Sequence, residues 1–342
     1  MIKNIGIVSL SSGIIGEESV RFEVDIGLRR LEEYGLNVKF LPNARKGLDY
    51  VKAHPEQRAQ DLLEAFRDPA LDMILCAIGG DDTYRLLPYL FEHGELADAI
   101  SEKVFLGFSD TTINHLMLHK LGLRSFYGQA FLPDICELSP ELLPYTRRYF
   151  EELIFTGTIR EIRPSDVWYE ERQHFSPDQV GRPLISHPNQ GFELLQGPPV
   201  FSGKILGGCI DSMYDIFNGD RYADMPVLCR RYGLFPAAEE WKGRILLLES
   251  SEEKPSPELY RRSLEYLKEA GVFEAVSGVL AGTPMDETYA EEYRQLLPEV
   301  IDRPELPVVF NLNIGHAKPR CILPFGVEAL VDAGKQVIRF IE

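Results

Sequence analysis

Cysteine is scarce in this sequence, and its spacing argues against small domains that are held together by zinc or by disulfide bonds. The 342 residues contain five scattered cysteines and no C-x-x-C pair. An odd number of cysteines without such pairs disfavours both a zinc-finger domain and a disulfide scaffold, and it is typical of proteins from a reducing compartment. We therefore expect a cytoplasmic protein whose stability comes from a packed core.

An excess of basic charge and long apolar runs are also lacking. Lys and Arg number 36 against 53 Asp and Glu, and the formal net charge is -17. Binding to nucleic acid or to an anionic membrane requires a basic surface, so we expect neither partner. No stretch approaches the roughly 20 apolar residues that cross a bilayer. The first residues predict a strand rather than a signal peptide.

Apolar segments of strand length alternate with amphipathic segments of helix length in the first half of the chain. Strands are predicted at 5–9, 38–41, 72–78, 104–108 and 125–127, and helices at 17–34, 56–66, 83–93, 111–121 and 139–153. This alternation predicts an α/β fold with a Rossmann-like, mostly parallel sheet covered on both faces. Ligands of such sheets bind beyond the carboxyl ends of the strands.

The second half begins with a segment of different character. Residues 163–200 are rich in proline and have little periodicity, and we interpret them as an ordered entrance loop, because long loops in compact proteins are often functional. Strands are predicted again at 203–208, 243–248, 276–281 and 308–310, helices at 210–217, 257–270 and 287–301, and β-hairpins at 322–341. We expect a Rossmann-like domain at 1–160 and a smaller, β-rich mixed α/β domain at 161–342.

Ser109 stands where an apolar strand changes abruptly into a helix, in the segment V-F-L-G-F-S-D-T-T. A serine at such a corner can act as a nucleophile, and the N–H of Asp110 at the helix N-terminus can then stabilise an oxyanion. Alternatively, Ser109 or Asp110 only caps the helix at 111–121, and this stretch alone favours the cap because caps are commoner than nucleophiles. The usual signature of a nucleophile elbow, G-x-S-x-G, is absent.

The glycine pair Gly79-Gly80 follows another strand, in the segment A-I-G-G-D-D-T. Two glycines let the backbone approach a ligand closely, so their N–H groups can complete an oxyanion hole or hold phosphate. The segment also resembles the G-G-D-G-T motif of phosphofructokinases and NAD kinases, which leaves a phosphotransferase as an alternative. Asp82 stands where that motif has glycine, and it places a negative charge where phosphate would bind.

Glu249 and His316 each follow an apolar strand, as Ser109 does. A carboxylate can orient a histidine by accepting its N–H, and the histidine can then accept the proton of a serine. Each residue alone is more often an ordinary surface or core residue, but the set of three favours chemistry. His115 and His119 share one face of a helix and could bind a metal, although no third ligand accompanies them.

The order of several motifs resembles the LD-carboxypeptidase family of serine peptidases, and within it the microcin C immunity peptidase branch. These motifs are Gly79-Gly80, G-F-S-D at 107–110, L-G-G at 206–208, L-L-L-E-S-S-E-E at 246–253, G-H-A-K-P at 315–319 and L-P-F-G at 323–326. The resemblance implies a catalytic triad of Ser109, Glu249 and His316, and an oxyanion hole from the N–H groups of Gly80 and Asp110. It also implies a homodimer that needs no metal and no cofactor.

Two substrate classes compete within this resemblance. LD-carboxypeptidases trim the terminal D-alanine from murein tetrapeptides, whereas immunity-type members hydrolyse the bond between an aspartyl group and a modified adenylate. We expect a small peptide or peptidyl-nucleotide substrate and favour the second class, because Trp168 in the entrance loop could stack on a nucleobase.

Further candidate contacts with the substrate are Gly79 and Asp81 beside the glycine pair, and Lys318 or Arg320 as ligands of a terminal carboxylate. One departure from the family pattern is Gln129, which stands where we expect proline, at the wall of the pocket.

Overall fold

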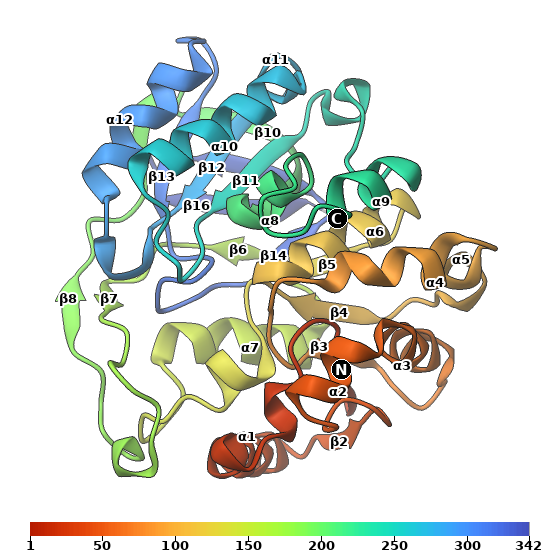
Figure 1. Ribbon diagram of the computed structural model, residues 1–342. Helices are drawn as coiled ribbons and strands as arrows, with labels where there is room; N and C mark the ends of the chain where they lie inside the picture. Colours follow the sequence, from red (N-terminus) through yellow and green to blue (C-terminus); the bar gives the residue numbers. More distant parts are fainter. Residues whose placement is uncertain (342) are drawn as a thin grey trace.

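Two sheets, each flanked by helices, make up the computed structural model, which describes residues 1–341 (Figure 1). The first sheet has the order β14-β5-β4-β3-β1-β2. Its five parallel strands are β1 (Asn4–Val8), β2 (Asn37–Phe40), β3 (Met73–Cys76), β4 (Val104–Gly107) and β5 (Ser125–Tyr127). The connecting helices are α1 (Arg21–Glu33), α2 (Leu48–Ala53), α3 (Pro55–Arg67), α4 (Leu87–Phe91), α5 (Glu95–Ala99) and α6 (Thr112–Lys120). The predicted Rossmann-like arrangement is confirmed.

The second sheet has the order β6-β16-β15-β10-β11-β12-β13-β9. Its parallel centre consists of β10 (Val200–Cys209), β11 (Ile245–Glu249), β12 (Gly278–Gly282) and β13 (Val308–Leu312). The antiparallel strands are β6 (Glu161–Ile162), β9 (Glu193–Gln196), β15 (Glu328–Asp332) and β16 (Val337–Ile341). Its helices are α8 (Ile210–Asp215), α9 (Met225–Arg231), α10 (Pro257–Glu269), α11 (Val272–Ala275) and α12 (Ala290–Ile301).

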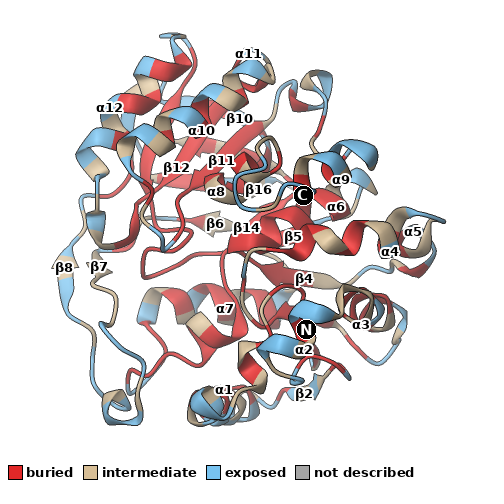
Figure 2. Ribbon diagram, viewed as in Figure 1, coloured by how far each residue is buried: buried red, intermediate tan, exposed pale blue. Residues whose placement is uncertain are grey.

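The central strands are apolar throughout because both faces of each sheet are covered. Every residue of β3, β11, β12 and β13 is buried, and Figure 2 shows these strands in red beneath helices with exposed outer faces. Strands buried on both faces read as continuous apolar runs instead of alternating ones. Helix α6 packs on β5 of its own sheet and also on α8 and β10, so it connects the two sheets.

Several predicted elements differ from the structure, and three of the differences concern the helix predicted at 139–153, the tail and the entrance loop. Helix α7 (Pro144–Thr156) begins five residues later than predicted, because Leu143 before the proline is extended and Pro144 occupies the first turn. Only β15 and β16 form a hairpin in the tail, because β14 (Leu323–Phe325) returns to the first sheet and pairs with β5. The entrance loop contains β9 and a ribbon of β7 (Val167–Tyr169) and β8 (Ser186–Pro188).

The return of β14 also bears on the expected domains. Residues 161–162 already lie in the second sheet as β6, next to the predicted boundary at residue 160. We keep the division at that residue as a proposal, with β14 as a segment that crosses it. None of the helices within residues 1–341 combines the length and the apolar character that a membrane span requires.

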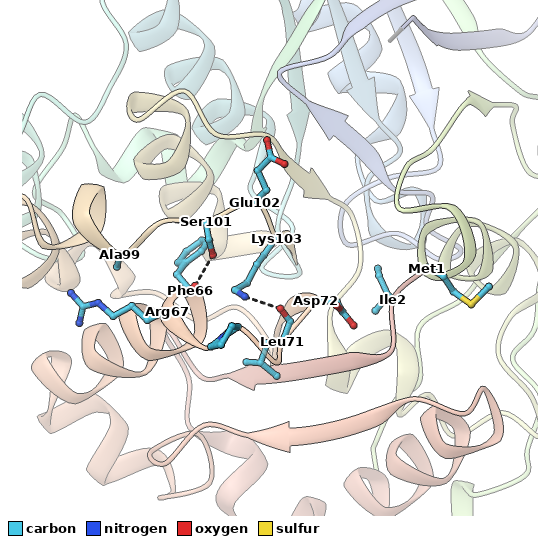
Figure 3. Close-up of a pocket in the computed structure, with 11 residues that line it drawn as sticks. Met1, Ile2, Phe66, Arg67, Leu71, Asp72, Ala99, Ser101, Glu102 and Lys103 are labelled. Atoms are coloured by element: carbon cyan, nitrogen blue, oxygen red, sulfur yellow. Dashed lines mark hydrogen bonds between the residues drawn. The ribbon is translucent and has the colours of Figure 1, made fainter.

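A hollow of about 570 Å³ opens at the amino ends of β1, β3 and β4 (Figure 3). Its polar groups are used internally: Lys103 Nζ donates to the backbone oxygen of Leu71 and Ser101 Oγ to that of Phe66. In a parallel sheet the amino ends lie opposite the edge where ligands bind. The predicted site residues do not line this hollow.

Candidate active site

Three side chains from different strands meet beyond the carboxyl ends of both sheets. Ser109 follows β4, Glu249 is the last residue of β11, and His316 lies four residues after β13. His316 Nε2 is 3.0 Å from Ser109 Oγ, and His316 Nδ1 is 2.8 Å from Glu249 Oε2. All three residues are buried. The chain therefore brings together the serine, histidine and carboxylate that the sequence predicts as a set.

Ser109 has a backbone geometry unusual for a residue other than glycine. Its φ of 67° lies in the left-handed region, and it begins a short 3-10 turn that leads into α6. Its side chain makes no capping hydrogen bond, and Thr111 Oγ1 bonds the Phe108 carbonyl instead. The capping interpretation of Ser109 is thus wrong. A strained serine between a strand and a helix, with its hydroxyl on a histidine, has the geometry of a nucleophile elbow.

Carboxylates control the protonation of His316. Burial disfavours the charged ring, but the charges of Glu249 and Glu252 outweigh burial and raise the pKa of His316 to about 10. Arg320 donates to the backbone oxygen of His316 at 2.9 Å, and the Phe108 ring packs edge-on against the imidazole. The ring is thereby held in one orientation between Glu249 and Ser109.

Tyr127 is a site residue that the sequence analysis did not identify. Its hydroxyl donates to Glu249 Oε1 at 2.5 Å and accepts hydrogen bonds from the Ser109 N–H and from Thr112 Oγ1. Burial and the neighbouring Glu249 raise its pKa well above the usual value, so it stays a donor. Tyr127 pairs with Gly107 across strands β5 and β4, and this position at a strand's carboxyl end was the available signal.

The glycine pair lies directly against Ser109. A Cβ added to Gly79 would be 2.6 Å from Ser109 Oγ, and Gly80 has a φ of 150°, which side chains rarely adopt. The carboxylate of Asp110 accepts hydrogen bonds from Ser11 Oγ and from the Thr83 N–H, which ties the glycine loop to the serine turn. Within residues 1–341, the N–H groups of Gly80 and Asp110 have no hydrogen-bond acceptor.

Asp82, the residue that departs from the phosphotransferase motif, serves an internal role. Its carboxylate is 2.6 Å from the guanidinium of Arg58, and both side chains are buried. Arg58 also donates to the backbone oxygens of Leu10 and Ser11. The pair therefore fastens the glycine loop to the end of β1. This use of Asp82 gives no support to phosphoryl transfer.

Ser109 faces a cleft formed by two adjoining hollows of about 30 and 320 Å³. The residues that line both hollows are Gly80, Asp81, Arg221, Glu252 and Glu253. Asp81, a predicted substrate contact, is therefore in the cleft, where Tyr222 donates a hydrogen bond to its carboxylate. Trp168 lies on β7, stacks on His187 with 4.4 Å between ring centroids, and lines neither hollow.

Lys318 and Arg320 do not reach the cleft. Lys318 is 4% exposed, and its ammonium contacts Glu137 at 2.5 Å and Glu171 at 2.9 Å. Arg320 is bound by Asp134 and by backbone oxygens of the His316 loop. Because both charges are already neutralised, we correct the prediction that either residue binds a terminal carboxylate of the substrate.

Gln129, which replaces the expected proline, links two segments away from the cleft. Its side-chain amide donates to the backbone oxygens of Thr146 in α7 and of Arg320. Gln129 is completely buried and does not line either hollow at Ser109. Its effect on a substrate would thus be indirect, through the loop that carries His316.

The histidine pair on α6 is not arranged for a metal. Both ring nitrogens of His115 are hydrogen-bonded, to Ser125 Oγ and to the Gly107 carbonyl, and burial lowers its pKa to about 4. Ligand atoms of Cys209, Glu249 and His316 do lie within 4.8 Å of one another. Burial and the charge of Glu249 raise the pKa of Cys209 well above normal, however, and metals bind the thiolate.

Two protein-family domains match this chain. The LD-carboxypeptidase N-terminal domain matches residues 5–128, and the LD-carboxypeptidase C-terminal domain matches residues 202–331. Together with the fold, these matches define a serine peptidase. The chain belongs to the LD-carboxypeptidase family, which confirms the resemblance seen in its motifs.

Individual relatives point to both of the substrate classes considered above. The microcin C7 self-immunity protein MccF of Escherichia coli is 28% identical over 84% of this chain and 78% of its own length. The murein tetrapeptide carboxypeptidase of Pseudomonas aeruginosa is 33% identical over 90% of this chain and 88% of its own. A crystal structure of an MccF-like protein from Streptococcus pneumoniae in complex with AMP is 61% identical, with a TM-score of 0.99 over 100% of this chain and 99% of that one.

The close approach of Gly79 to Ser109 generates the first prediction. Gly79→Ala places a methyl group 2.6 Å from Ser109 Oγ, so the hydroxyl must move away from His316. The methyl group would also lie 2.6 Å from Ser109 Cβ, so the serine turn itself must shift. We expect kcat to fall by about 10²-fold, as for other displacements of about 1 Å in active sites, in a protein that still unfolds cooperatively. Gly334→Ala, whose added methyl meets only ordinary contacts, serves as the matched control. Wild-type kcat in the Gly79 variant would show that the loop does not position the serine.

The buried Arg58–Asp82 pair generates a prediction about stability. Asp82→Asn leaves a buried guanidinium without its counter-charge, which typically costs about 3 kcal/mol or more. We expect the free energy of unfolding, measured with urea, to fall by that amount. Asp81→Asn provides the control, because Asp81 accepts a hydrogen bond from Tyr222 and forms no buried ion pair. Equal stability of the two variants would contradict a structural role for Asp82.

Proposed function

We propose that the protein is a serine carboxypeptidase or amidase that hydrolyses the amide joining an aspartyl group to a nucleotide, as in the microcin C type of compound. The observation that carries this proposal is the hydrogen-bonded series Ser109–His316–Glu249 at the cleft. Neutral His316 accepts the Ser109 proton while Ser109 Oγ attacks the carbonyl carbon. Protonated His316 then donates to the leaving nitrogen, and water hydrolyses the acyl-enzyme by the reverse sequence.

The remaining predicted residues have defined roles in this mechanism. The N–H groups of Gly80 and Asp110 stabilise the oxyanion, since both residues line the same hollow as Ser109 and neither N–H has another acceptor among the described residues. Glu249 fixes the imidazole tautomer, and Tyr127 holds Glu249 in place. Gly79 keeps the space around the nucleophile open. No residue in this mechanism calls on a metal or a cofactor.

The nucleotide part of the substrate is supported by the relatives. The 61% identical pneumococcal protein was crystallised in complex with AMP, and the microcin C7 self-immunity protein is among the curated relatives. Trp168 remains a proposed stacking partner for the base, although one face of its ring already packs on His187. The homodimer implied by the family is likewise kept as a proposal.

A murein tetrapeptide is the second candidate substrate. The murein tetrapeptide carboxypeptidase of Pseudomonas aeruginosa covers 90% of this chain at 33% identity, a higher identity than that of the self-immunity protein. The same three residues would cleave the bond before the terminal D-alanine. The AMP complex of the 61% identical relative is the observation that favours the nucleotide substrate.

A comparison of the two substrates tests the proposal. We expect hydrolysis of aspartyl sulfamoyl adenosine with a kcat/KM at least tenfold above that of the murein tetrapeptide, in EDTA and without added nucleotide. Ser109→Ala is expected to lower turnover by about 10⁴-fold with an unchanged circular dichroism spectrum. Turnover by Ser109→Ala at the parent rate would refute the nucleophile assignment, and dependence on ATP and Mg²⁺ would support the phosphotransferase instead.

A further inference from the structure

A second carboxylate lies beside His316 Nε2, the ring nitrogen that faces Ser109. Glu252 Oε2 lies 2.9 Å from His316 Nε2, the same nitrogen that lies 3.0 Å from Ser109 Oγ. A carboxylate is stable at that distance only when Nε2 carries a proton. Because Nδ1 donates its own proton to Glu249, the ring then holds two protons and cannot accept a third from Ser109. Glu252 must therefore leave Nε2 before the histidine can act as a base.

Hydrogen bonds and ion pairs hold the residues on both sides of Glu252, whereas the Glu252 side chain is exposed and can change its rotamer. The Ser251 N–H donates to Asp211 at 2.8 Å, Glu253 pairs with Arg221 at 2.7 Å, and Lys254 pairs with Asp286 at 2.6 Å. Glu252 itself is 61% exposed, and His316 is its one ion-pair partner among the described residues. A rotation of this side chain, without movement of the backbone, is enough to uncover Nε2.

The charges in the cleft indicate which kind of group can draw Glu252 away. Two cations line the cleft: Arg221, which is paired with Glu253 and Asp215, and Lys52, which lies in the larger hollow near Asp81. Asp211 and Glu252 form an ion pair with neither of them among the described residues. The hydroxyl of Ser251, also in the lining, is buried and has no hydrogen-bond partner. An ammonium group has three donors for such acceptors.

We propose that Glu252 determines specificity: it blocks His316 in the free enzyme and is drawn off by an ammonium group of the substrate. This inference rests on the proposed function, since an aspartyl group carries its α-ammonium one carbon away from the carbonyl that Ser109 attacks. Once Glu252 binds the ammonium, Nε2 loses its negative neighbour and releases its proton to water. Ser109 then donates its proton to the freed Nε2, so that binding of the correct substrate completes the base.

The preference for a free amine tests the proposal directly. We expect wild-type kcat/KM for aspartyl sulfamoyl adenosine to exceed that for its N-acetyl derivative by about 10- to 100-fold, the usual value of a charge-assisted hydrogen bond. In Glu252→Gln the ratio should fall to within about threefold. The matched variant Glu265→Gln, which removes an exposed carboxylate of α10 outside the cleft, should keep the preference. An unchanged ratio in Glu252→Gln would overturn the proposal.

The protonation of His316 gives a second readout that needs no substrate. The ionisable groups around His316 are Glu249, Glu252, Asp211, Cys209, Tyr127 and Arg320. Removing the Glu252 charge lowers the pKa of His316, so the base is available at lower pH. In Glu252→Gln, the pH midpoint for labelling of Ser109 by a fluorophosphonate should therefore move down by about one unit or more, while the control Glu265→Gln labels as the parent does.

The two readouts separate failure of this inference from failure of the proposed function. If labelling shifts as expected but no variant cleaves either aspartyl compound, the substrate assignment fails and the Glu252–His316 contact stands. If Glu252→Gln labels with the parent's pH midpoint, Glu252 does not hold the histidine and the inference fails. A loss of labelling as complete as that of His316→Ala would also overturn it, because Glu252 would then be required rather than inhibitory.

Discussion

The hydrogen bond between Glu249 and His316 is the interaction on which the rest of the site depends. It selects the tautomer of His316 in which Nε2 faces Ser109. It also requires β11, which ends at Glu249, and β13, which ends four residues before His316, to end next to each other. Tyr127, from the first sheet, binds the other oxygen of the same carboxylate and also accepts the N–H of Ser109. Ser109, His316, Glu249 and Tyr127 therefore form one of the contacts between the two sheets.

This arrangement explains why so many charged and polar groups are buried near the cleft. Arg58 and Asp82 hold the glycine loop, Asp110 connects that loop to the serine turn, and Arg320 supports the loop that carries His316. Buried ion pairs are seldom a source of stability compared with apolar packing. Their use here fixes three chain segments in relation to one another, which a catalytic site requires to within about 0.5 Å.

Much of the fold was predictable from sequence because both sheets have buried parallel centres. The short apolar runs of β3 and β11 are typical of central strands. The candidate site residues are found at the ends of such strands: the glycine pair follows β3, Ser109 follows β4, and Glu249 is the last residue of β11. The order of motifs then identified the family. The pairing of β14 with β5 was not predictable, since it joins residues almost 200 positions apart by backbone hydrogen bonds that have no side-chain signature.

The errors in the site share one physical cause. Lys318 and Arg320 follow His316 closely in sequence, and a cation near a catalytic histidine is a reasonable ligand for a carboxylate. Their partners, Glu137 and Asp134, come from a distant segment, so nothing local reveals that both charges are neutralised internally. Tyr127 and Glu252 were missed for the same reason, because each acts through a side chain more than 60 residues away.

Proton NMR of the imidazole tests the central claim most directly. A proton shared between His316 Nδ1 and Glu249 should give a resonance well downfield of the amide region. We predict that this resonance is present in the parent and in Ser109→Ala and is lost in His316→Asn and Glu249→Gln. A downfield resonance that survives in Glu249→Gln, or its absence from the folded parent at every pH and temperature, would contradict the account.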